Sequence, residues 1–139
     1  MAVEITLSVP EEMMQLARKV ADDANMSVEV VLLNWLQHPV PKPTLTDVDT
    51  QLDALSSTTD IHLWTVVHRH LEASQEQRLN EIVEKHEGGE TLSVDENAEW
   101  SDINEWVMVL MLLRSQALVL LKERGYDVTR FFKPQSKYN

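Results

Sequence analysis

The strict alternation of apolar and polar side chains from Val3 to Val9 constrains the fold of this chain more than any other feature. Such alternation predicts a β-strand with one buried and one exposed face. Pro10 follows, and because proline has no amide proton and a φ suited to the first turn of a helix, it ends the strand and begins a helix. A lone strand cannot satisfy its own backbone hydrogen bonds, so we expect it to pair with the same strand of a second chain.

Two helices are predicted directly after the strand. The first runs from Glu11 to about Asn25, a residue type that tolerates the left-handed conformation found at helix ends. Ser27 caps the second, which extends to about Gln37 and is broken by the proline-rich residues 38–43. Two helices of this length cannot bury both their apolar stripes alone, which predicts an intertwined homodimer. The predicted dimer core comprises Val3, Ile5, Leu7, Val9, Val20, Val31 and Trp35.

The rest of the chain predicts a second helical region. Residues 39–59 are rich in Pro, Thr, Ser and Asp and are interpreted as a linker, with one or two helical turns favoured by its apolar residues. Residues 60–125 contain two helical stretches joined near Gly88, which predicts an antiparallel hairpin. Residues 126–139 are a basic, aromatic tail. The expected fold class is therefore mainly α, with modules at 1–38, 39–59, 60–125 and 126–139.

Two capping-box patterns mark helix starts within the hairpin. Ser74 and Gln77 restart or continue its first helical stretch. Ser93 and Glu96 begin its longest helix, which is predicted to close on Gly125.

The charge balance limits what the whole surface can bind. The chain has 12 Lys and Arg against 23 Asp and Glu, a net charge of -11, so nonspecific binding of nucleic acid is disfavoured. It has no cysteine, which excludes disulfides and thiolate metal sites. No basic segment followed by an apolar one marks the N-terminus, so a cytoplasmic location is expected. The apolar residues 106–121 are interrupted by Arg114, Ser115 and Gln116, and we expect no membrane span.

Histidines are the candidate metal ligands in a chain without cysteine. No two of the four that follow residue 60 are spaced four residues apart, and no carboxylate pair completes a known ligand spacing, so no metal or other cofactor is expected. The four are His62, His68, His70 and His86. With three glycines and no pattern of nucleophile and base, we expect neither an enzyme nor a small-molecule substrate.

Pro10, Leu16, the run Arg18-Lys19-Val20-Ala21 and the turn ending in Ser27-Val28 stand in a familiar arrangement. On these residues the chain resembles, without a gap and over about a quarter of its length, the ribbon-helix-helix family of Arc- and MetJ-type repressors and antitoxins. More loosely, Ala117 to Gly125 resembles the helical extensions of small bacterial antitoxin-like proteins.

The resemblance implies a DNA-binding surface. In that family the two-stranded ribbon of the dimer enters the major groove, which implies base contacts by Glu4, Thr6 and Ser8. It also implies that backbone amides at the start of the second helix bind phosphate. The residues implied there are Met26, Ser27 and Val28. A solvated ribbon face and plain helix capping are the alternatives.

Aromatic residues of the hairpin and the tail are the candidate partner-binding residues, with a place in the core as the alternative. They are Trp64, Phe131 and Phe132, together with the neighbouring Val67.

The function expected is a homodimeric DNA-binding transcriptional regulator of antitoxin or autorepressor type, whose C-terminal helices bind a protein partner such as a toxin. An acidic dimeric adapter that binds a protein partner but no DNA is the alternative, because residues 1–38 carry two basic side chains against six acidic ones. A purely structural helical dimer is a third reading.

Overall fold

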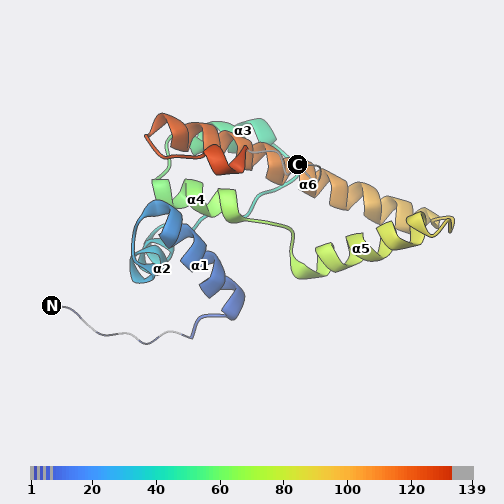
Figure 1. Ribbon diagram of the computed structural model, residues 1–139, viewed down its shortest axis with the longest axis horizontal. Coiled ribbons are helices and arrows are strands. Elements are labelled where there is room, and N and C mark those ends of the chain that lie inside the picture. Colours follow the sequence, from blue (N-terminus) through green and yellow to red (C-terminus); the bar gives the residue numbers. More distant parts are fainter. Residues whose placement is uncertain (1, 3, 5, 7, 133–139) are drawn as a thin grey trace.

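The computed structural model describes residues 2, 4, 6 and 8–132, and this part of the chain is mainly α, as the sequence predicts (Figure 1). Six α-helices are followed by one short 3-10 helix within these residues. They are α1 (Glu11–Ala24), α2 (Val28–Gln37), α3 (Val48–Leu55), α4 (Asp60–His68), α5 (Ala73–Glu87), α6 (Val94–Glu123) and η1 (Thr129–Phe131).

Helix α4 is the centre of the molecule. In Figure 1 it lies between α3 and α6 on one side and α1 and α2 on the other, and it contacts both α1 and α6. Because neighbours cover it on several sides, apolar residues around its whole circumference are buried instead of one stripe. Its buried residues are Ile61, Leu63, Trp64, Thr65, Val66 and Val67.

Local signals set the helix ends, and the predicted ends are confirmed at four places. Asn25 ends α1 in the left-handed region with φ 60°, and the Ser27 hydroxyl accepts a hydrogen bond from the Val30 amide at 3.3 Å. Ser93 and Glu96 form the predicted capping box at the start of α6. Gly125, with φ +100°, follows the end of α6.

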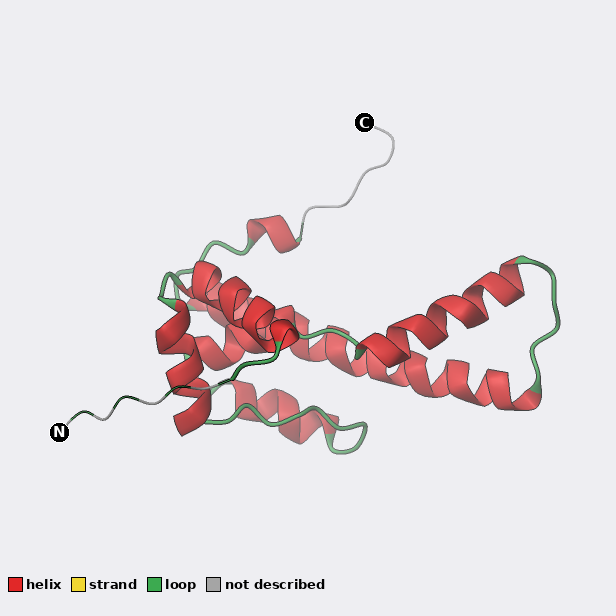
Figure 2. Cartoon of the chain, turned by 90° about the horizontal axis from the view of Figure 1, so that it is seen from below, coloured by secondary structure: helices red, strands yellow, loops and turns green. Residues whose placement is uncertain are grey.

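The first stretch of the predicted hairpin differs from expectation, because it is two separate helices. Residues 69–72 are not helical, and α5 begins after Glu72, which forms a capping box with Gln75. The cap is therefore Glu72 and not Ser74. Only α5 and α6 form the hairpin: the chain runs outward along α5, turns near Gly88 and returns along α6 (Figure 2).

This hairpin extends away from the other helices, so the molecule has two parts (Figures 1 and 2). We call residues 73–105, which comprise α5, the turn and the first part of α6, the arm. The remaining described residues are the body. Helix α6 belongs to both, since its later residues pack against α3 and α4 in the core.

The expected ribbon strand is not seen among the described residues. Residues 2, 4, 6 and 8 are exposed and have no strand assignment, while Val3, Ile5 and Leu7 lie outside the described part of the chain. The argument that α1 and α2 need a second chain to bury their stripes does not hold for α1, which packs against α4 of the same chain. The outer apolar residues of α2 remain exposed. Val20 and Val31 are fully buried within one chain.

By length and composition α6 is apolar enough to cross a membrane, the one such helix in the described part of the chain. The sequence predicts no membrane span because residues 106–121 are too few and too polar. The helix that contains them is longer than that stretch, which is why it passes the length criterion. Its later part is nevertheless built into the body through Leu113, Ala117, Leu118 and Leu121, all of which are buried.

Candidate functional site

The residues implied to read bases stand at the N-terminal end of the body. Glu4, Thr6 and Ser8 are all exposed, on the segment that leads into α1. Exposure is required for base contact and is equally expected of a solvated face. Their chemistry is limited to one carboxylate, which can accept from a cytosine amino group, and two short hydroxyls.

The start of α2 offers fewer phosphate donors than the sequence implied. The Met26 amide donates to the Ala21 carbonyl at 2.9 Å and so belongs to the end of α1. The Ser27 hydroxyl is used to cap α2. Amides in the first turn of a helix have no acceptor within the helix, so of the three implied residues Ser27 and Val28 keep their amides as donors. Glu29 is exposed beside them and opposes an anion.

Helix α2 is apolar on two faces. Its inner face packs in the body, where Val31 is buried and the Trp35 indole donates to the Thr65 hydroxyl at 3.0 Å. Its outer face is uncovered. The outer residues are Val30, Leu33 and Leu36, whose exposed fractions are 47%, 55% and 62%. Soluble helices ordinarily present polar residues on the face opposite the core, so this second apolar face is unusual.

An apolar groove of about 470 Å³ adjoins this outer face. It lies between the start of α1 and the end of α2, directly beside the N-terminal segment, because Ser8 itself lines it. Its other apolar lining residues include Val9, Met13, Leu16, Leu32, Trp35 and Leu36.

The predicted dimer-core residues are therefore divided. Val20, Val31 and Trp35 pack against their own chain, Val9 lines the groove at partial exposure, and the other three lie outside the described residues. A dimer that uses this end of the molecule would have to form on the outer face of α2 and the groove.

The four candidate partner-binding residues are also divided. Trp64 and Val67 are 1% and 2% exposed, so their side chains belong to the core of the body. Phe131 is half-buried against Trp64, and the guanidinium groups of Arg114 and Arg130 lie 5.6 and 4.6 Å from the centre of its ring. Phe132, with 57% of its surface exposed, is the only one of the four with its side chain mostly on the surface.

A polar cluster fixes the start of the tail to the body. The buried carboxylate of Asp23 on α1 contacts both His68 on α4 and Arg130. Burial, together with the positive charges of Lys19 and Arg114, lowers the pKa of His68 to about 4. The ring is therefore neutral near pH 7, and its Nε2–H can donate to Asp23.

The negative charge of the chain is concentrated on the arm. Residues 73–105 hold ten acidic side chains against Arg78 and Lys85. Arg78 pairs with Glu99 at 2.6 Å, and Lys85 with Glu96 at 2.7 Å. Even with these pairs, eight of the eleven net negative charges of the chain reside here.

No group of His, Asp and Glu that suits a metal ion occurs among the described residues. The sequence reasoning did not single out Arg69 and Gln51, which line a cavity between α3, α4 and α6. The one sequence feature that could have drawn attention to Arg69 is the scarcity of basic residues between α2 and the arm. Lys42 and Arg69 are the two lysine or arginine residues there.

Comparison with known proteins gives no relative: no family model, no curated protein and no solved structure matches this chain. The functional argument therefore depends on the residues of the chain itself.

Proposed function

We propose that this chain is a homodimeric DNA-binding regulator of the ribbon-helix-helix type, with the N-terminal segments of two copies paired as its ribbon. The observation that carries the proposal is the uncovered apolar face of α2 beside the groove. Both adjoin the segment whose alternation predicts a strand.

Pairing of two N-terminal strands would satisfy their backbone hydrogen bonds and place their apolar face over the groove. The outer residues of α2 would then be removed from water. Burial of apolar surface contributes roughly 25 cal/mol per Å², so a contact of this kind favours association.

The polar face of the same ribbon would carry Glu4, Thr6 and Ser8 outward to base edges. None of these groups, and neither of the two helix amides, carries a positive charge that would attract phosphate. The affinity for DNA must therefore come from sequence-specific contacts to the bases.

The DNA-binding part is tested on the DNA upstream of the gene that encodes the chain. Binding of the purified protein is measured across a salt series and compared with a Thr6→Ala/Ser8→Ala double variant. We expect specific binding that the double variant loses and that a matched control in the arm, Ser74→Ala/Ser101→Ala, retains. Absence of specific binding at low salt contradicts the proposal, as does binding that the double variant leaves unchanged.

The dimer is tested separately by light scattering after size exclusion. A Leu33→Glu/Leu36→Glu variant should be monomeric, because two carboxylates would be buried in the interface. The matched control is Met108→Glu/Met111→Glu, which changes two exposed apolar residues of α6 and should remain dimeric. A wild-type protein that is monomeric at tens of micromolar contradicts this part of the proposal.

A second candidate, the acidic adapter, is favoured by the charge of the arm. An extended acidic hairpin suits a basic protein surface, since complementary potentials speed association. The test is co-purification with a basic product of a neighbouring gene, using a Glu84→Gln/Glu87→Gln/Asp95→Asn/Asp102→Asn variant. Loss of that partner, in a protein that binds no DNA, selects the adapter over the regulator.

A further inference from the structure

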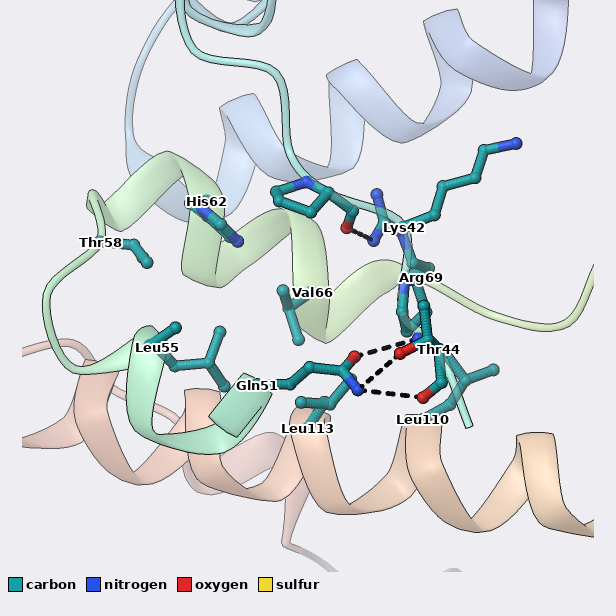
Figure 3. A pocket seen from close by; sticks show the side chains of 13 residues that line it. Lys42, Thr44, Gln51, Leu55, Thr58, His62, Val66, Arg69, Leu110 and Leu113 are labelled. Carbon is teal, nitrogen blue, oxygen red and sulfur yellow. Dashed lines mark hydrogen bonds between the residues drawn. The ribbon is translucent and has the colours of Figure 1, made fainter. Parts of the chain in front are cut away.

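A cavity of about 300 Å³ lies where the segment of residues 41–44 crosses α3, α4 and α6 (Figure 3). It is about the size of the smaller ligand pockets in proteins. Side chains from three helices make its walls largely apolar. These side chains are Leu55 of α3, Val66 of α4, and Leu110 and Leu113 of α6.

Arg69, the residue that ends α4, lines this cavity and has no acidic partner. Its guanidinium donates one hydrogen bond, from Nη1 to the Pro41 carbonyl at 2.8 Å. No ion pair to Arg69 forms within the described part of the chain, although the sequence has 23 acidic residues. The nearest acid in sequence, Glu72, caps α5 instead.

Arg69 is half-buried, and of the five N–H donors of its guanidinium the Pro41 carbonyl takes one. The other donors can bind water or a ligand. Burial lowers the pKa of Arg69.

His62 adds a second uncommitted polar group. It precedes Arg69 by two turns of α4, and Figure 3 shows the two side chains on either side of Val66. The imidazole has no hydrogen-bond partner among the described residues, and burial together with the positive charge of Arg69 lowers its pKa. The ring is thus available as a neutral donor or acceptor near neutral pH.

The rim of the cavity is fixed in advance. The Gln51 side chain accepts from the Thr44 amide and donates to the Thr44 carbonyl, both at 3.0 Å (Figure 3). It also donates to the Thr46 carbonyl at 2.8 Å. These bonds hold the 44–46 segment on α3. A ligand would therefore enter a cavity whose wall is already ordered, which reduces the entropy lost on binding.

We infer that this cavity binds a small organic anion with an apolar body, a monocarboxylate whose carboxylate pairs with Arg69 and whose hydrocarbon part lies on the leucine floor. Arg69 and a carboxylate match in geometry, because the guanidinium can donate two parallel hydrogen bonds. A polyphosphate suits the cavity poorly, since Lys42 points away from it in Figure 3 and leaves a single arginine. The inference does not depend on the proposed function.

The test measures binding to the full chain by calorimetry. The probe is 3-phenylpropanoate, and its matched neutral analogue is 3-phenylpropan-1-ol. We expect a Kd of about 1 mM or below for the acid. The alcohol should bind at least about tenfold more weakly, because it offers no charge to Arg69. Equal affinity for the two compounds, or no binding of the acid, overturns the inference.

Two variants locate the site. Arg69→Gln should weaken binding of the acid by about tenfold or more, whereas Arg18→Gln, an exposed arginine on α1, should not change it. Ala54→Phe fills the cavity from an exposed position on α3 and should abolish binding with Arg69 intact. If Arg69→Gln fails to keep the helical circular dichroism of the wild type, Ala54→Phe decides. Undiminished binding by Ala54→Phe places the probe elsewhere and contradicts the inference.

Discussion

The body and the arm are made from the same kind of secondary structure but are held together by different forces. In the body, side chains such as Trp64, Leu63 and Leu121 are fully enclosed by helices distant in sequence. In the arm, all of whose residues the structure describes, Ile82 and Ile103 are the buried apolar residues, and neither belongs to the main core. Ion pairs such as Arg78 with Glu99 also join α5 to α6.

The stability of the chain therefore resides mainly in the body. Removing apolar surface from water contributes in proportion to area, whereas exposed ion pairs contribute little and are screened by salt. The arm should therefore open locally at a lower free energy than the body unfolds.

The largest effect is expected from Trp64→Ala in the body. Loss of a fully buried tryptophan should lower the free energy of unfolding by about 3 to 5 kcal/mol, because the helices around α4 cannot close the cavity that remains. Urea denaturation measures it. Trp100→Ala, at a half-buried position of the arm, is the control and should cost much less. Equal losses for the two variants would contradict a distinction between body and arm.

The second effect should be confined to the arm. Ile82 is fully buried between α5 and α6, and Ile82→Ala should cost about 2 to 4 kcal/mol of local stability. Amide hydrogen exchange should accelerate throughout α5 and the first half of α6 while α1 and α4 remain protected. If protection in α4 falls as much as in α5, arm and body unfold as one unit. The exposed Glu81→Ala serves as the neighbouring control.

The third effect is a pH dependence of the body. His68 has a pKa of about 4 in the folded chain against 6.5 when unperturbed. As the pH falls below 6.5 the unfolded chain takes up a proton before the folded chain does. The free energy of unfolding is therefore at its full value above pH 6.5 and declines between 6.5 and 4.

Because the His68 ring is partly accessible, we expect this decline to be about 1 to 2 kcal/mol, less than the full shift would give. His68→Asn, which retains a donor to Asp23, should remove this part of the pH dependence in urea titrations. The arm variant His86→Asn should leave it in place. A stability that instead rises as the pH falls towards 6.5 and stays level below it would show that Asp23 holds His68 in its protonated form in the folded chain.

The smallest effect concerns a single carboxylate of the arm. The Lys85 ammonium, followed by the Ser93 amide, holds the pKa of Glu96 down to about 2 from 4.5. The contribution of ionised Glu96 to the stability of the arm is therefore fully present above pH 4.5 and is lost as the pH falls through 2. Glu96→Gln should remove this acid-induced loosening of the arm, seen by nuclear magnetic resonance of arm amides, whereas the exposed Glu84→Gln should not. An unchanged acid profile in Glu96→Gln would contradict the assignment.

Helix ends were predictable because their causes are local. Asn25, Ser27, Ser93 and Gly125 act through hydrogen bonds or backbone angles within a few residues, and each lies where the sequence places it. The interruption at residues 69–72 was not predictable, since no proline or glycine marks it. It follows from the packing of α4 in the body while α5 turns outward, which is a tertiary effect.

The candidate sites were harder to predict because they join distant residues. Asp23 and Arg130 are 107 positions apart, and no periodicity links them. The sequence offers Trp64 and Phe131 as candidates for binding a partner, with a place in the core as the alternative, and only the fold shows that they pack on each other. Helix α4 explains most of the difference: apolar residues on all sides leave its partners unspecified, so the sequence did not show that it would pack between α1 and α6.

The enclosed position of α4 also has a consequence for the nascent chain. Helices α1, α2 and α4 are synthesised long before residues 113–121 of α6, which cover the opposite side of α4. At roughly 5 to 20 residues per second, translation leaves that side of α4 open to water for several seconds. During this interval Leu63, Trp64 and Val67 form part of an incomplete core, so apolar surface of the emerging chain stays open to water until its last long helix has left the ribosome.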